Sequence, residues 1–207
     1  MNKTGISYCD FSSNPIRARN TETDKVGWFC TKVSYGCTHC YSETLNVGRF
    51  GNGLAYTKPN ESKVEFVLNE KEIESWRKHK TPSKIFVCDM TDLFHEMIPF
   101  EMILRVFYGM ATADWHTFQV LTKRPERALE FFKWWKMNKG IPPYSGALPN
   151  VWFGVTVENK KELRRIDILS EIPAVVKFVS AEPLLEDLII PTDKIDWLIC
   201  GGESGKD

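Results

Sequence analysis

The chain has 207 residues, enough to bury a sizeable core within one compact domain. Its 27 basic and 27 acidic side chains balance, which excludes an attraction of the chain as a whole to nucleic acid or anionic membranes. The N-terminus has no apolar leader, and no run approaches about 18 apolar residues, so we expect a cytoplasmic protein without membrane contact.

In chain order, the first predicted strand covers residues 26–29 and leads directly into a cysteine-rich segment. A helix is predicted over residues 69–78, after a long loop. We therefore expect residues 1–83 to form an N-terminal cysteine-loop region. This region belongs to a single domain that spans residues 1–207.

From residue 84 onward, short apolar runs alternate with segments of helical periodicity. The runs cover residues 85–88, 118–121, 151–155, 175–179 and 195–200, and they lack the polar alternation of half-exposed strands. Helices are predicted over residues 100–113 and 125–138, and from an N-cap at Asn159. This order predicts an α/β protein with a partial TIM-like (βα)6 barrel of parallel strands. No G-x-G-x-x-G motif supports a dinucleotide-binding fold instead.

Polar side chains follow nearly every predicted strand. In chain order they are Asp89, Thr91, Asp92 and His95; then Thr122, Lys123 and Arg124; then Thr156 and Glu158; then Ser180 and Glu182; and finally Glu203 and Ser204 after two glycines. Each position alone is better explained as a helix cap or a loop-facing charge. Because the carboxyl ends of parallel strands meet at one rim, the set as a whole predicts a wide polar pocket there.

Three cysteines, Cys30, Cys37 and Cys40, have the spacing Cys-x6-Cys-x2-Cys. In a reducing compartment, clustered cysteines are more often metal ligands or catalytic groups than disulfides. A structural zinc site needs a fourth ligand, and neither Cys9 nor His39 completes a familiar zinc pattern. Three thiolates favour a [4Fe–4S] cluster with one open iron, and zinc remains the alternative. The other cysteines are interpreted as structural residues.

The order of motifs resembles a phage- and bacteria-borne family of three-Cys-motif proteins, which in turn resembles divergent radical S-adenosylmethionine (SAM) enzymes. The matching pieces are Asn14-Pro15, "GCTHCYSE", "IFVCDMTDLFHEMIP", "HTFQVLTKRPER", "LPNVWFGVTVEN", "FVSAEPLLE" and "DWLICGGESG". Two features depart from the radical SAM pattern. The first cysteine gap is six residues rather than three, and the Gly-Gly-Glu motif follows the last predicted strand rather than the second.

The resemblance implies a cluster on the three cysteines, SAM on its open iron, and an electron donor as partner. Lys123 and Arg124 are then expected to bind a carboxylate or phosphate. The acidic candidates for ribose hydroxyls or the SAM amino group are Asp89, Asp92, Glu158 and Glu182, with Glu203 as a further cofactor-binding candidate. The family usually continues beyond "GGESG", so we expect the chain to be a fragment.

The sequence does not name a substrate, and the basic rim at Lys123 and Arg124 leaves a nucleotide or nucleic acid open. The alternative function is a non-enzymatic module, stabilised by zinc, that binds nucleic acid or a partner protein. Neutral net charge weighs against strong nucleic-acid binding, which depends on neutralising phosphates.

Overall fold

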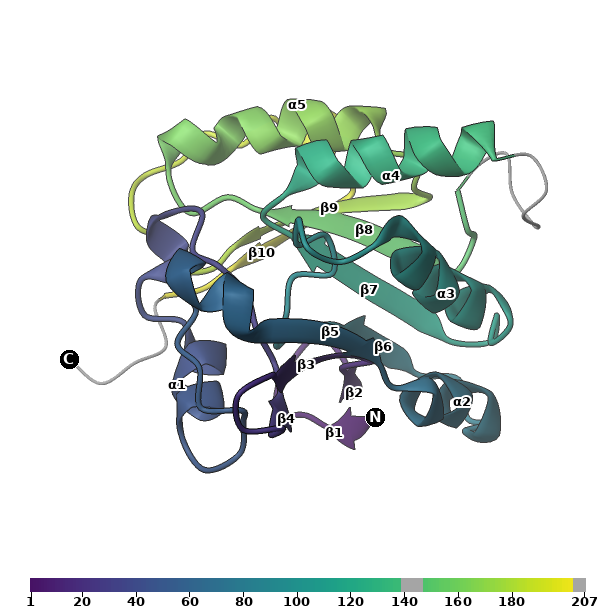
Figure 1. Cartoon of the computed structure of the whole chain (residues 1–207). Coiled ribbons are helices and arrows are strands. Elements are labelled where there is room, and N and C mark those ends of the chain that lie inside the picture. Colours follow the sequence, from purple (N-terminus) through teal and green to yellow (C-terminus); the bar gives the residue numbers. More distant parts are fainter. Residues whose placement is uncertain (139–146, 203–207) are drawn as a thin grey trace.

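The computed structural model describes residues 1–138 and 147–202, which form a seven-stranded and a three-stranded sheet with flanking helices (Figure 1). The order in the main sheet is β1-β2-β6-β7-β8-β9-β10. Strand β1 pairs antiparallel with β2, and every other neighbouring pair is parallel. These strands are β1 (Asn2–Lys3), β2 (Phe11–Ser13), β6 (Lys84–Val87), β7 (Thr117–Thr122), β8 (Val151–Thr156), β9 (Val176–Ala181) and β10 (Trp197–Cys200). The expected α/β class with a mostly parallel sheet is confirmed.

The connections carry the helices and the small sheet. The α-helices are α1 (Tyr41–Val47), α2 (Glu70–Lys78), α3 (Phe100–Ala111), α4 (Pro125–Met137) and α5 (Arg164–Glu171). The 3₁₀ helices are η1 (Tyr35–Cys37), η2 (Lys58–Lys63), η3 (Lys160–Leu163) and η4 (Thr192–Lys194). The small sheet is antiparallel, with β3 (Ile16–Asn20) between β4 (Val26–Gly27) and β5 (Val64–Leu68).

The first strand of the parallel series is not where the sequence predicted it. Residues 26–27 form β4 of the small sheet, whereas β2 lies beside β6 in the main sheet. Strand β2 contains two serines and so lacks an apolar signal. Ser13 is nevertheless buried. Its hydroxyl tolerates burial because Oγ donates to Glu72 Oε1 at 2.9 Å and accepts from Trp76 Nε1 at 2.8 Å. Both hydrogen-bonding partners belong to α2, so polar contacts take the place of hydrophobic packing between Ser13 and this helix.

Helices α2 to α5 cover one face of the main sheet. Alternate strand residues such as Ile85, Phe118 and Phe153 are buried there against Phe107 of α3 and Phe131 of α4. Figure 1 shows α4 and α5 above β8 and β9, with α2 and α3 further along the sheet. The predicted helix at 159 is divided into η3 and α5, and the side chain of Asn159 does not cap it.

The opposite face of the sheet is aromatic and strongly curved. The ring of Tyr8, which precedes β2, lies 6.2 Å from Phe86 on β6 and 5.7 Å from Trp197 on β10. Phe86 and Trp197 therefore lie within about 12 Å of each other, whereas four steps of about 4.8 Å in a flat sheet would span about 19 Å. The backbone carbonyl of Tyr8 also accepts from Gln119 Nε2 at 3.1 Å. The sheet thus bends around the segment before β2.

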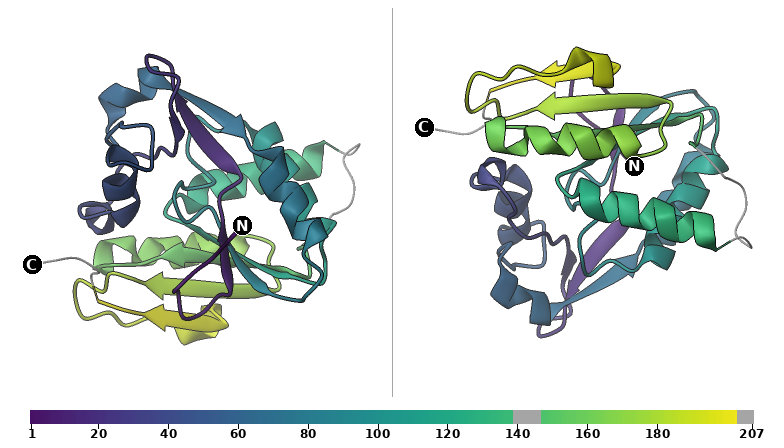
Figure 2. Two further views of the ribbon diagram at one scale, coloured as in Figure 1. Left: turned by 90° about the horizontal axis from the view of Figure 1, so that it is seen from below. Right: turned by 90° about the horizontal axis from the view of Figure 1, so that it is seen from above.

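The small sheet and α1 lie at the carboxyl ends of the parallel strands of the main sheet. In Figure 1 the arrowheads of β7, β8 and β9 point toward the side occupied by α1. In both views of Figure 2, α1 lies on the left, away from α2 and α3 on the right. No helix among the described residues is long and apolar enough to cross a lipid bilayer.

We predict that Gly154→Ala lowers the free energy of unfolding by about 1–3 kcal/mol, the usual cost of overpacking. A Cβ atom on Gly154 would lie 2.5 Å from ring atoms of Phe178 on the curved aromatic face. Urea denaturation measures the loss. Gly5→Ala is the matched control, because a Cβ there meets nothing within 4 Å. Equal stability of both variants would show that Phe178 moves aside without cost.

Candidate functional site

Three cysteines line one cavity at the carboxyl ends of the parallel strands. Cys30 follows β4, Cys37 ends η1, and Cys40 is the N-cap residue of α1. The cavity has a volume of about 120 Å³, room for several water molecules or a small inorganic group. The strand ends supply other walls, among them Asp89, Asp92, Thr122, Lys123, Arg124 and Thr156. The structure therefore brings the three predicted ligands and several predicted polar residues to one place.

A buried arginine connects the start of the cysteine segment to the sheet. Nη2 of Arg124 donates to the carbonyl and the hydroxyl oxygen of Thr31, both at 2.9 Å. Its Nη1 donates to Asp92 Oδ2 at 3.1 Å and lies 3.6 Å from Sγ of Cys30, while Nε donates to Glu96 at 3.1 Å. Only 4% of Arg124 is exposed. Its guanidinium is therefore engaged by the protein, although the resemblance assigned it to a ligand.

The carboxylate of Asp92 also has all its hydrogen bonds with groups of the protein itself. Besides Arg124, its carboxylate accepts from Thr122 Oγ1 at 2.7 Å and from the backbone N–H groups of Lys123 and Phe94, each at 3.0 Å. Burial acts to raise the pKa of Asp92, but the Arg124 cation and these donors outweigh burial and hold the pKa below its usual range. Asp92 is thus an ionised anchor that fixes Arg124 and the end of β7.

Glu158 fastens the middle of the cysteine segment in a similar way. Its Oε2 pairs with Nη1 of Arg165 at 3.0 Å in a fully buried ion pair. Its Oε1 accepts from the backbone N–H of Gly36 at 3.3 Å, and a Cβ on Gly36 would lie 3.2 Å from the same carboxyl group. Glu158 lies outside the lining of the thiol cavity. Its placement favours a structural role over the ligand contact that the resemblance implied.

Helix α1 is held by polar groups that the sequence analysis did not single out. Ser42 Oγ and Tyr56 Oη donate to the carbonyl of Met90, at 2.6 Å and 3.0 Å. The buried amides of Asn46 and Asn52 bind each other at 2.8 Å and reach backbone carbonyls of the small sheet and its flanking segments. Isolated Ser and Asn residues carry no periodic signal, so their burial could be found only from the fold.

A second cavity of about 500 Å³ adjoins the first and shares Gly36, Cys40, Phe86, Asp89, Leu121, Lys123 and Thr156 with it. Asp89 accepts from Asn14 Nδ2 at 2.6 Å, and its pKa is raised, mainly by burial. Glu182 accepts from Ser180 Oγ at 3.2 Å. Among the described residues, Asp89, Glu182 and the ammonium of Lys123 have no ion-pair partner. The larger cavity thus presents two carboxylates and one cation to a ligand.

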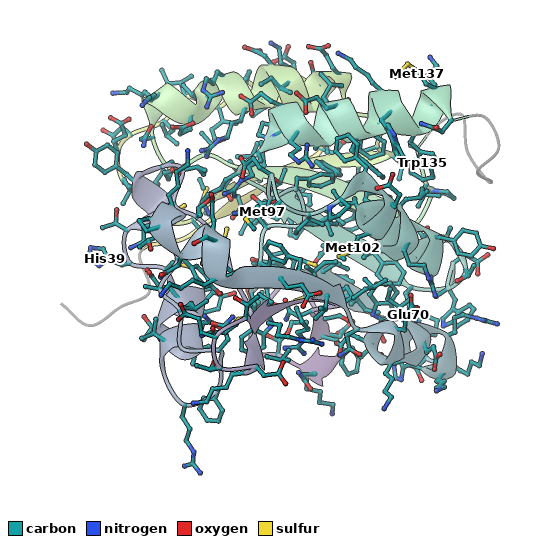
Figure 3. The ribbon with its side chains drawn as sticks, viewed as in Figure 1. His39, Glu70, Met97, Met102, Trp135 and Met137 are labelled. Carbon is teal, nitrogen blue, oxygen red and sulfur yellow. The ribbon has the colours of Figure 1, made fainter. Side chains whose placement is uncertain are left out.

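The remaining candidates lie elsewhere. Glu203 is outside the described residues. Cys9 is buried in the turn before β2 and lines neither cavity. His39 is exposed at the rim of the larger cavity and lies at the outer edge of the molecule in Figure 3. Neither alternative fourth ligand is placed with the three thiols in the smaller cavity.

Cys88 is a fourth thiol in the wall of the smaller cavity, although the sequence analysis interpreted it as structural. It directly follows β6 and has φ of 62°, a left-handed conformation that is strained for a residue other than glycine. Its neighbour in the wall, Thr91, is 2% exposed, and its hydroxyl has no hydrogen-bond partner within the described residues. A strained backbone at a cavity-lining cysteine, beside a buried hydroxyl without a partner among the described residues, is a feature of ligand sites.

The donor set fits a sulfur-seeking metal group, but the side chains do not form a ready site for a single ion. Within residues 1–138 and 147–202, no three His, Cys, Asp or Glu side chains are arranged to hold one metal ion. Thiolates that share one zinc at about 2.3 Å must have their sulfur atoms within about 4.6 Å of one another. A cluster gives each thiolate its own iron, so the sulfur atoms stand farther apart.

Comparison with protein-family models matches residues 3–207 to a family described as "Protein of unknown function (DUF5131)". No curated protein and no solved structure matches the chain.

His95 is expected to make stability depend on pH. Its Nδ1 accepts from Met97 N–H at 3.3 Å, so Nε2 carries the proton and donates to Thr31 Oγ1 at 3.0 Å. Burial, and next the Arg124 cation, lower the pKa of His95 to about 4. Below about pH 6.5 the unfolded chain takes up a proton that the folded chain refuses, so the free energy of unfolding should fall as pH drops toward 4.

The expected loss attributable to His95 is about 3 kcal/mol between pH 7 and pH 4. Urea denaturation of wild type and His95→Gln at both pH values measures it, because the variant should lose less stability than wild type. His39→Gln, at an exposed position, serves as the control and should behave like wild type. The same pH dependence in wild type and His95→Gln would contradict the assignment.

Proposed function

The chain belongs to the DUF5131 family, and we propose that it is an enzyme of the radical SAM type. In this proposal Cys30, Cys37 and Cys40 hold a [4Fe–4S] cluster with one open iron, and SAM binds beside it in the larger cavity. The observation that carries the proposal is that all three thiols line one cavity at the carboxyl ends of parallel strands.

The chain's own residues supply placement and charge. Arg124 and Glu158 fix the cysteine segment at Thr31 and Gly36, so the thiols are held from two sides. When bound, the cluster and SAM supply one-electron chemistry, namely reductive cleavage of SAM with hydrogen-atom abstraction from a substrate. A single-electron donor is therefore the implied partner. The substrate stays open, with a nucleotide or nucleic acid as one class.

The charges of the larger cavity complement those of SAM. The sulfonium and amino group of SAM are positive and its carboxylate is negative. Asp89 and Glu182, which lack an ion-pair partner among the described residues, can accept from the cationic part, and the ammonium of Lys123 can donate to the carboxylate. The aromatic rings of Tyr8, Tyr41 and Phe86 nearby can cover an adenine ring.

The curvature of the main sheet agrees with the same proposal. The curvature implied by the Tyr8 contacts with Phe86 and Trp197 is what a partial barrel requires, and we propose that the six parallel strands form one.

A cluster held by thiolates needs cysteines that remain reduced, so we also propose a cytoplasmic location.

We predict that the full chain, reconstituted anaerobically with iron and sulfide, binds about four of each and absorbs broadly in the visible range. Cys30→Ser, Cys37→Ser and Cys40→Ser should each lose most of the iron, because a cluster needs every one of the three thiolates. Cys200→Ser is the matched control, since Cys200 is exposed and lines neither cavity. Metal and sulfide analysis gives the result.

Cys88→Ala decides whether the cluster has three or four thiolate ligands. Retained iron supports an open iron, and loss of iron would indicate a closed four-thiolate centre without a place for SAM. A colourless protein with one zinc per chain, lost in the three cysteine variants, would favour the alternative zinc-stabilised binding module.

We predict that Lys123→Ala weakens SAM binding to the iron-loaded protein by about 10- to 100-fold, the value of a hydrogen bond to a charged group. Equilibrium dialysis with labelled SAM measures the dissociation constant. Lys136→Ala is the control, because Lys136 is exposed on α4 and lines neither cavity. Unchanged affinity in Lys123→Ala would place the SAM carboxylate elsewhere.

A further inference from the structure

Arg124 makes a contact with the thiol site that its neighbours do not share. Within residues 1–138 and 147–202, its Nη1 is the one side-chain donor that reaches a sulfur of the three clustered cysteines, at 3.6 Å from Sγ of Cys30. The same guanidinium holds the next residue, Thr31, through two hydrogen bonds of 2.9 Å. Arg124 therefore controls both the backbone and the sulfur at one corner of the cavity.

The other side of the guanidinium is equally fixed. Asp92 Oδ2 accepts from Nη1 at 3.1 Å, and both carboxylate oxygens of Glu96 accept from Nε at 3.1 Å. Asp92 is itself held by Thr122 Oγ1. The end of β7 thus fixes Asp92, Asp92 fixes Arg124, and Arg124 fixes Cys30. Such a chain of charge-assisted contacts transmits the rigidity of the sheet to a loop.

We propose that Arg124 is a positioning residue for the thiol site, which holds residues 30–31 in place and stabilises negative charge on Sγ of Cys30. This inference rests on the proposed function only for its second part, because the positioning of the loop requires no metal. It reassigns Arg124 from the ligand-binding role that the resemblance implied to the support of a ligand-bearing cysteine.

The shape of the side chain matters as much as its charge. A guanidinium offers a planar fork of donors, and here the fork serves four different residues at once. An ammonium is a compact donor that cannot span these acceptors. Lysine at this position would keep the positive charge near Sγ but would lose the hold on Thr31. The two parts of the proposal can therefore be separated by two substitutions.

The first experiment follows hydrogen–deuterium exchange of the peptide around residues 28–40 in the full chain before iron loading. Arg124→Gln and Arg124→Lys should both exchange about tenfold faster there than wild type, because each loses hydrogen bonds to Thr31. Thr31→Val removes only the hydroxyl contacts and should show a smaller increase. The Thr31→Val variant also tests the positioning role by hydrogen–deuterium exchange if Arg124→Gln fails to fold.

The second experiment measures the reduction potential of the iron-loaded chain by anaerobic spectroscopic titration. Hydrogen bonds and positive charge near a cluster thiolate favour the reduced state, so Arg124→Gln should have a more negative potential than wild type. Arg124→Lys, which keeps the charge, should fall between them. Arg127→Gln is the matched control one turn away, in the first turn of α4, because Arg127 contacts Ile98 and the ring of Phe100 but no cavity residue.

Each result of the two experiments tests a separate part of the proposal. Unchanged exchange in the Arg124 and Thr31 variants overturns the positioning role. Faster exchange with an unchanged potential overturns the effect on the sulfur. If wild type binds no iron, the proposed function fails, while faster exchange in the variants still supports Arg124 as the residue that holds the cysteine segment.

Discussion

The candidate site depends on a buried guanidinium in a loop that has little regular structure of its own. Between β4 and α1 the cysteine segment forms only the short turn η1, so its backbone groups need partners from elsewhere. Arg124 provides them at Thr31, and Glu158 provides one at Gly36. Both residues lie just past the ends of parallel strands, β7 and β8, which are held by hydrogen bonds to their neighbours in the sheet. The sheet therefore determines where the sulfur atoms lie.

The polar residues at the strand ends divide into two groups by their partners. Asp92, Arg124 and Glu158 are ion-paired and committed to the protein. Asp89, Lys123 and Glu182 line the larger cavity and keep capacity for a ligand. Residue type does not separate the groups, because each contains acidic and basic members. Pairing with an opposite charge within the described residues separates them, and this pairing follows from the fold.

The sequence predicted the features that leave a periodic or apolar trace. The strand–helix alternation after residue 84 and the polar strand ends were both visible in it. Strand β2 was missed because its buried residue, Ser13, is polar and is satisfied by hydrogen bonds to Glu72 and Trp76 of α2. Cys88 resembled an ordinary buried cysteine, because its left-handed backbone has no signature in composition. The anchoring role of Asn46 and Asn52 depends on contacts distant in sequence, which no local pattern reveals.

The position of β2 has a consequence for how the molecule is assembled. Residues 14–83 separate β2 from its parallel partner β6, so the small sheet and the cysteine segment are synthesised before β6, which joins β2 to the rest of the main sheet. Closing so long a loop is entropically costly and slow. The thiols therefore reach their final surroundings only after β6 and β7 have joined β2. Until then the walls that the ends of β6 and β7 supply to the thiol cavity are absent, so the sulfur atoms are more open to solvent than in the folded chain.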